Sequence, residues 1–202
     1  MTKKRQSGLI SYSNIKLGNN MPSFALPTSC CDVKNSEAQG CLEYCYARRM
    51  EKLRKTCRAK WLKNFDATLK NNFVQKVIGE LKKDTSSIVR WHVSGDVYSQ
   101  EYLQKIFKIA DKFKEKQFYI YTKAIDLDWS ERPENLNVIL SDDNLIWQTH
   151  HKDFDGIATI RFNKKDPIPS GFGLCGHQAA GMTCAECKRC FNKGVRVVFN
   201  KH

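Results

Sequence analysis

Residues 87–123 read SIVRWHVSGDVYSQEYLQKIFKIADKFKEKQFYIYTK, and this stretch decides the predicted fold. Residues 87–97 predict a strand that ends in Ser-Gly-Asp at positions 94–96. Apolar residues within 100–116 recur at three- and four-residue steps, which predicts an amphipathic helix. Residues 118–123 predict a second strand. A strand, a helix and a strand in succession indicate a βαβ unit, and therefore a parallel α/β sheet.

The rest of the chain extends this pattern at both ends. Three more strands are predicted at 137–141, 157–162 and 195–199. Between Cys45 and about Lys83 the apolar residues recur at helical spacing. Residues 1–25 are predicted as a short extended arm, the segment between Pro22 and Pro27 as a strand or extended segment, and 28–41 as a loop. We expect a single α/β domain over 1–202, built on an open parallel sheet or a partial (β/α) barrel.

Polar residues follow the first two predicted strands where a parallel sheet places its sites, beyond the carboxyl ends of the strands. Asp96 is a candidate catalytic or ligand-orienting carboxylate, and the alternative is a turn aspartate that caps the next helix. Lys123 ends the second strand and is a candidate for holding an anion. These two residues are expected to lie at one edge of the sheet.

Nine cysteines in 202 residues call for an explanation. The N-terminus has charge but no apolar stretch of the secretory type, and no apolar run approaches the roughly 20 residues of a membrane span. We therefore expect a cytoplasmic protein that does not enter a membrane and whose thiols stay reduced. In that compartment the cysteines are better explained as metal ligands than as disulfides.

The densest cysteine group lies in the loop 173–191, which is expected to bind a cluster. Cys184, Cys187 and Cys190 follow one another at two-residue gaps, and Cys175 precedes them. This spacing lets one loop wrap a cuboidal iron–sulfur cluster, a 4Fe–4S cluster, whereas zinc sites more often use two separated pairs. Zinc and unligated buried cysteines remain alternatives.

A sparser group lies near the N-terminus. Cys41 and Cys45 are three residues apart, and Cys30 or Cys31, of which we take Cys31, supplies a third thiol. Cys45 is expected at a helix N-terminus, where exposed N–H groups favour a thiolate. Three thiolates would leave one iron of a cluster open to substrate, which favours a catalytic site. The alternatives are a structural zinc or a supplement to the C-terminal group.

The formal net charge of +13 suggests an anionic partner. Residues 47–63 hold eight basic residues and one acidic residue. A basic helix of this kind can follow a phosphate backbone, so nucleic acid is a candidate partner. The alternatives are a solvated helix face, a small anionic ligand or an acidic host protein.

Several of these motifs together resemble the phage gene product 88 family. They are PSFALP at 22–27, the cysteines that lead to Cys45-Tyr46-Ala47, HVSGD at 92–96, FYIYTK at 118–123, the cysteines from 175 to 190, and VVFNKH at 197–202. The resemblance covers about residues 14–202. It implies a phage or mobile-element protein.

A more distant resemblance is to radical S-adenosylmethionine (SAM) enzymes. Tyr44-Cys45-Tyr46-Ala47 after Cys41 is similar to the start of these enzymes, which carry Cys-x3-Cys-x2-Cys. Ser94 and Gly95 then stand where those enzymes place a glycine-rich turn for the SAM amino group. The chain departs from the pattern, because a long gap precedes Cys41 and the turn has a single glycine. It is also short for a full barrel of about 250 residues.

Two functions are consistent with these observations. The first is an iron–sulfur enzyme of the radical SAM type, with a catalytic cluster on the N-terminal cysteines and an auxiliary one on the C-terminal cysteines. The second is a non-enzymatic protein that binds nucleic acid or a host protein, with a structural iron–sulfur or zinc site.

Overall fold

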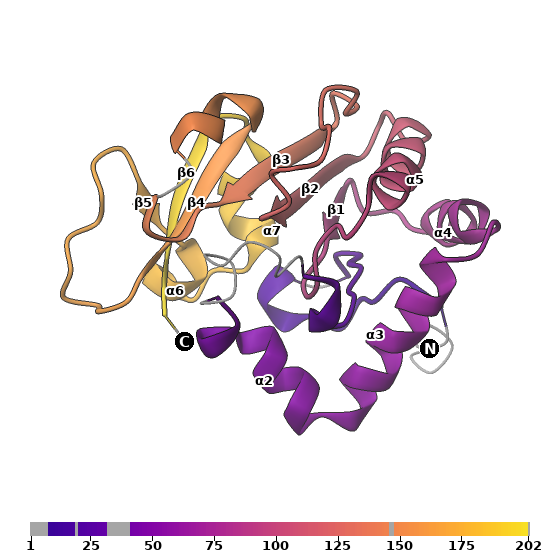
Figure 1. The fold of residues 1–202 in the computed structure, drawn as a ribbon, viewed down its shortest axis with the longest axis horizontal. Coiled ribbons are helices and arrows are strands. Elements are labelled where there is room, and N and C mark those ends of the chain that lie inside the picture. The colour runs from indigo at the N-terminus through magenta and orange to yellow at the C-terminus, as the bar shows by residue number, and fades with distance from the viewer. Residues whose placement is uncertain (1–7, 19, 32–40, 146–147, 202) are drawn as a thin grey trace.

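A computed structural model describes residues 8–18, 20–31, 41–145 and 148–201. Its centre is a six-stranded sheet in the order β1-β2-β3-β4-β6-β5, in which every neighbouring pair is parallel. The strands are β1 (Ile88–Trp91), β2 (Gln117–Thr122), β3 (Leu136–Ser141), β4 (Gly156–Arg161), β5 (Gly173–Leu174) and β6 (Val195–Asn200). The sequence predicted either an open parallel sheet or a partial barrel, and the open parallel sheet is confirmed. Its edge strands are β1 and β5 (Figure 1).

One face of the sheet packs against helices. Because side chains alternate along a strand, Phe118 and Ile120 of β2 face the larger apolar core. That core also contains the apolar residues of α4 (Phe73–Leu81) and α5 (Gln100–Asp111). The Ser99 hydroxyl accepts the Tyr102 N–H at 3.2 Å and so starts α5 at the end of the preceding turn. The predicted βαβ unit is thus present.

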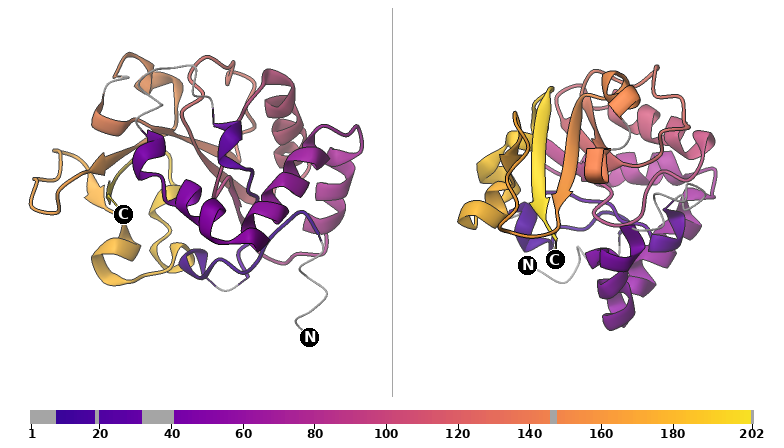
Figure 2. Two further views of the ribbon diagram at one scale, coloured as in Figure 1. Left: turned by 60° about the horizontal axis from the view of Figure 1, so that its bottom comes forward. Right: turned by 60° about the vertical axis from the view of Figure 1, so that its left-hand side comes forward.

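The opposite face of the sheet carries the C-terminal cysteine segment. Tyr119 and Tyr121 of β2 point to this face, where they pack with Cys184, Cys190 and Phe191. The segment contains α6 (Gly176–Ala180), α7 (Cys184–Cys187) and the 3-10 helix η6 (Arg189–Phe191). The right-hand view of Figure 2 shows these yellow helices on one side of β6 and the magenta helices on the other.

The described part of the N-terminal region is not an arm, as the sequence suggested, but a buried layer. Phe24 is 0% exposed, and its ring stacks on Trp91 with centroids 4.9 Å apart. The Phe24 N–H donates to Arg90 O at 3.1 Å, and the Val93 N–H donates to Phe24 O at 3.0 Å. Residues 20–26 therefore run beside β1, although only an isolated bridge between Ser23 and Arg90 forms.

Two predicted elements are shorter in the structure. The strand expected over 87–97 ends at Trp91, because His92 takes a left-handed backbone with φ of 60° and begins a turn. Gly95 in this turn has φ of 73°, and a Cβ there would lie 2.6 Å from Leu26 Cβ. The helix expected over 100–116 ends at Asp111.

The helical stretch after Cys45 is divided into separate helices. α2 (Tyr46–Leu53) and α3 (Lys55–Thr68) meet at Arg54, whose extended backbone breaks the helix, and α4 follows. Figure 1 shows α2 and α3 as a V below the sheet. Across the described ranges, none of the helices combines the length and the apolar character required to traverse a bilayer.

Candidate metal centre and adjoining cavity

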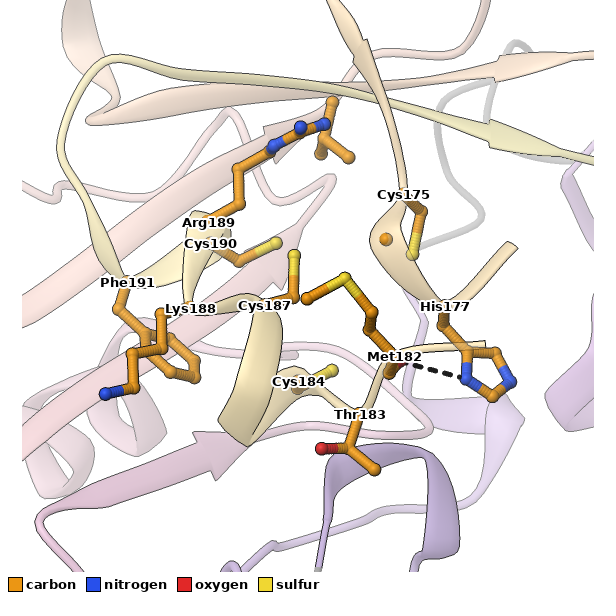
Figure 3. A pocket seen from close by; sticks show the side chains of 12 residues that line it. Cys175, His177, Met182, Thr183, Cys184, Cys187, Lys188, Arg189, Cys190 and Phe191 are labelled. Carbon is orange, nitrogen blue, oxygen red and sulfur yellow. Dashed lines mark hydrogen bonds between the residues drawn. The ribbon is translucent and has the colours of Figure 1, made fainter. Parts of the chain in front are cut away.

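Four cysteines of the C-terminal segment line one pocket. Cys175 caps the start of α6, Cys184 and Cys187 begin and end α7, and Cys190 lies in η6. Figure 3 shows their thiol groups pointing toward a common space beside the Met182 thioether. The structure therefore brings together the C-terminal ligands predicted from the sequence.

Local backbone features hold these thiols in place. Thr183 and Glu186 form a capping box at the start of α7, and Lys188 takes a left-handed φ of 54° that turns the chain from α7 into η6. Gly176 faces Cys187, and a Cβ at this position would lie 2.7 Å from Cys187 Sγ. A glycine at this position therefore keeps space around the thiol.

Hydroxyl groups and cations surround the same thiols. The Tyr121 hydroxyl donates to Cys190 Sγ at 2.7 Å. Burial raises the pKa of Cys184 and of Cys190, while the positive charge of Arg90 opposes that rise at both. Lys16 lies close enough to Cys175, Cys184 and Cys190 to interact with their charges. The positive charges of Arg90 and Lys16 thus act against burial, which favours the protonated thiols of Cys184 and Cys190.

The pocket is not arranged around a single ion. Among the described residues, no group of three or more His, Cys, Asp or Glu side chains has the arrangement that would hold a metal ion. The enclosed space is about 20 Å³, little more than one water molecule needs. Met182 lines this space and is 38% exposed. His177 is on the pocket wall, and its ring nitrogen hydrogen-bonds Met182 O at 3.2 Å.

A larger cavity of about 200 Å³ lies on the same face of the sheet. Its walls come from the carboxyl-terminal parts of β1, β2, β3, β4 and β6, from the N-terminal segment and from the start of α2. The lining includes Cys41, Cys45, Tyr121, Asp143, Arg90 and Lys16. The cavity therefore lies near the carboxyl ends of these strands, where parallel sheets place their sites, but Ser94, Gly95, Asp96 and Lys123 are not among its lining residues.

Cys45 occupies the helix terminus predicted for it. It is the residue that precedes the first turn of α2. A hydrogen bond from Cys41 and the N–H groups of Arg48 and Ala47 lower the pKa of Cys45 to about 6, against the effect of burial. Cys41 and Cys45 are thus in contact and share one wall of the cavity.

Two neighbouring cysteines, Cys30 and Cys31, are the candidates for the third N-terminal ligand. Cys30 is 5% exposed and belongs to the apolar core. Burial raises the pKa of Cys31, and the charges of Asp96 and Cys45 add to the rise, so Cys31 lies near both. All nine cysteines are free thiols. Residues 32–40, which complete the predicted loop, lie outside the described residues.

The structure places Asp96 between the ends of two strands and outside both cavities. Its carboxylate accepts the Val97 N–H, the Thr122 hydroxyl and the Lys123 N–H, each at 2.7 Å. Burial raises its pKa to about 6, and these three donors oppose that rise. Ser94 and Gly95 pack against Leu26, whose N–H donates to Ser94 O at 2.9 Å. These residues therefore join the turn to the N-terminal layer.

Lys123 contacts the cavity indirectly. Its Nζ donates to Asp143 Oδ2 at 2.7 Å and to Ser141 O at 2.8 Å, and both partners line the cavity. The Tyr44 hydroxyl also donates to Asp143 Oδ2, at 2.9 Å. Asp143 Oδ1 is buried and has no hydrogen-bond partner among the described residues. Asp143 thus lines the cavity with one carboxylate oxygen engaged by Lys123 and Tyr44.

The open, all-parallel sheet, which carries a four-cysteine pocket on one face, makes the chain a mixed α/β protein. The family model described as gene product 88 matches residues 2–193. The chain therefore belongs to this phage gene-product family, as its motifs predicted. No curated protein and no solved structure matches the chain.

Proposed function

We propose that this protein binds an iron–sulfur cluster at Cys175, Cys184, Cys187 and Cys190, and that it is a radical-SAM-like enzyme. The observation that carries the proposal is the convergence of these four thiols on one pocket next to a second, larger cavity. The second cavity contains two of the three thiols expected to hold a catalytic cluster.

The arrangement of the four thiols favours a cluster over zinc. Zinc sites more often use two separated cysteine pairs, whereas Cys184, Cys187 and Cys190 form one dense triplet. In a 4Fe–4S cluster each cysteine binds a different iron, so the thiols need not share a centre. The positive charges of Arg90 and Lys16 would offset the negative charge of the cluster.

Cluster binding requires the pocket to open. A space of about 20 Å³ is too small for a cuboidal cluster, and the Met182 side chain occupies part of the pocket (Figure 3). Methionine has three rotatable side-chain bonds and adapts its shape readily. Since Met182 is already 38% exposed, we expect it to turn toward solvent when a cluster binds.

The N-terminal cysteines are proposed to hold the catalytic cluster, with Cys31, Cys41 and Cys45 as ligands. Cys31 is preferred to Cys30 because Cys30 is part of the apolar core. A cluster with one open iron would supply an electron to the sulfonium of bound SAM. The cavity of about 200 Å³ beside Cys45 offers space for SAM, with Asp143 Oδ1 as an acceptor for its ammonium group and Arg90 as a partner for its carboxylate.

Anaerobic incubation with SAM and dithionite tests this function. The reconstituted protein is expected to release 5′-deoxyadenosine, and Cys45→Ala is expected to release none, because one iron ligand is lost. Cys57→Ala is the matched control, since Cys57 lies on α3 and lines neither cavity. The radical SAM assignment is wrong if the wild-type protein, loaded with iron and sulfide, neither binds nor cleaves SAM.

A second candidate function is nucleic-acid binding by α2 and α3, with the metal centre in a structural role. Six basic side chains of these helices are exposed, and none of the six forms an ion pair with the described residues. They are Arg48, Arg49, Lys52, Arg54, Lys55 and Arg58. Exposed cations on projecting helices are suited to a phosphate backbone.

Neutralising part of this surface tests the second function. Replacing Arg48, Arg49, Arg54 and Lys55 by glutamine is expected to weaken binding to DNA or RNA. The slope of log K against log salt should fall by about 0.9 for each phosphate that the variant no longer neutralises. The control neutralises four exposed lysines of the α4–α5 region, namely Lys82, Lys83, Lys108 and Lys112. Equal affinity of both variants would contradict a specific role for α2 and α3.

A further inference from the structure

Two tyrosines of β2 reach the thiols of the four-cysteine pocket from the sheet. The Tyr121 hydroxyl donates to Cys190 Sγ at 2.7 Å. The Tyr119 ring packs in one cluster with Cys184 and Cys190, and its hydroxyl donates to the Met21 sulfur at 3.8 Å. Side chains two residues apart on a strand share a face, so this pair is a direct consequence of the Tyr-x-Tyr sequence.

Arg90 holds the two rings from the neighbouring strand. Arg90 pairs with Tyr119 in the register of β1 and β2. Its guanidinium lies 4.6 Å from the Tyr121 ring centroid and 5.2 Å from that of Tyr119. The guanidinium thus packs against both rings and places a positive charge near the thiols.

Hydrogen bonds to the ligand sulfurs and the local charge are among the factors that set the potential of an iron–sulfur cluster. Reduction adds negative charge to the cluster, and an O–H donor or a cation stabilises that charge. The potential therefore becomes more positive when such groups contact the sulfurs.

We infer that Tyr121 and Tyr119, oriented by Arg90, tune the reduction potential of the cluster on the C-terminal cysteines. The inference rests on the proposed cluster. Tyr121 also lines the cavity of about 200 Å³, so it connects a ligand sulfur of the first pocket with the wall of the second. The two tyrosines are positioning residues, because they act through the cysteines and not on a substrate.

Redox titration of the full-length protein tests the inference. The potential is measured by electron paramagnetic resonance after anaerobic reconstitution, in a Cys45→Ala background that removes the N-terminal cluster. Tyr121→Phe and Tyr119→Phe are each expected to shift the potential to more negative values, with a larger shift in the double variant. Tyr98→Phe is the control, because its hydroxyl bonds Thr68 at 2.7 Å and not a cysteine of the pocket.

The outcomes separate the inference from the proposed function. A protein that contains no iron and sulfide overturns both. A second outcome is a cluster that is present and has the same reduction potential in three proteins: Cys45→Ala alone, Cys45→Ala with Tyr121→Phe, and Cys45→Ala with Tyr119→Phe. That result overturns only the role of the tyrosines. An equal shift in Tyr98→Phe also overturns that role, because the effect would then not depend on the bond to sulfur.

Discussion

Replacing Cys187 with alanine is expected to remove the C-terminal cluster, a loss of about four iron atoms per chain. Cys187 ends α7 and its thiol faces the other three cysteines of the pocket, each of which would bind an iron of its own. Iron bound by Cys41 and Cys45 should be retained, because those residues line a different cavity. Iron analysis and the visible absorption of anaerobically purified protein measure the effect.

Two further variants are measured beside Cys187→Ala. Cys57→Ala removes a thiol on α3 that lies outside both cysteine groups, and it should leave the iron content unchanged. Cys41→Ala should remove the iron of the other group alone. If Cys41→Ala and Cys187→Ala each remove all of the metal, the protein has a single shared site, and the assignment of two separate centres is wrong.

Replacing Asp96 with alanine is expected to lower the free energy of unfolding by about 3 kcal/mol or more, because buried donors that lose their acceptor cost about 1–3 kcal/mol each. The Thr122 hydroxyl and the N–H groups of Val97 and Lys123 would all lose their partner. The bonds join the end of β1 to the end of β2, so the loss affects the core of the sheet. Urea unfolding measures the change.

The control for Asp96 is Asp66→Ala, which removes an exposed carboxylate on α3 and should change stability by less than about 0.5 kcal/mol. A stable Asp96→Ala variant that has lost only its activity would favour the catalytic role predicted from the sequence. Reduced stability would instead show that Asp96 positions the turn.

The sheet was predictable because its strands and α5 have strong local patterns. Alternation and apolar runs locate β2, β3, β4 and β6 to within a residue or two. The early end of β1 was not predictable, since His92 takes its left-handed backbone in a tertiary setting in which its ring bonds the Tyr102 hydroxyl at 2.9 Å. Phe24 likewise has no periodic neighbours, and its burial depends on Trp91, which is distant in sequence.

The candidate site was predictable in its ligands but not in their surroundings. The two-residue gaps of Cys184, Cys187 and Cys190 bring these thiols together by local structure alone. Arg90 and Asp143 lie on elements that meet only through the parallel topology of the sheet, so neither stood out in the sequence. A charged residue inside the apolar strand 88–91 was the available signal for Arg90.

The most direct test of the iron–sulfur assignment is the iron, acid-labile sulfide and zinc content of the wild-type protein purified without oxygen. We predict iron and sulfide in equal amounts, at about four of each per cluster, and no bound zinc. One zinc per chain without sulfide would contradict the assignment and favour a tetrahedral structural site. Protein that binds neither metal after reconstitution would contradict a metal centre altogether.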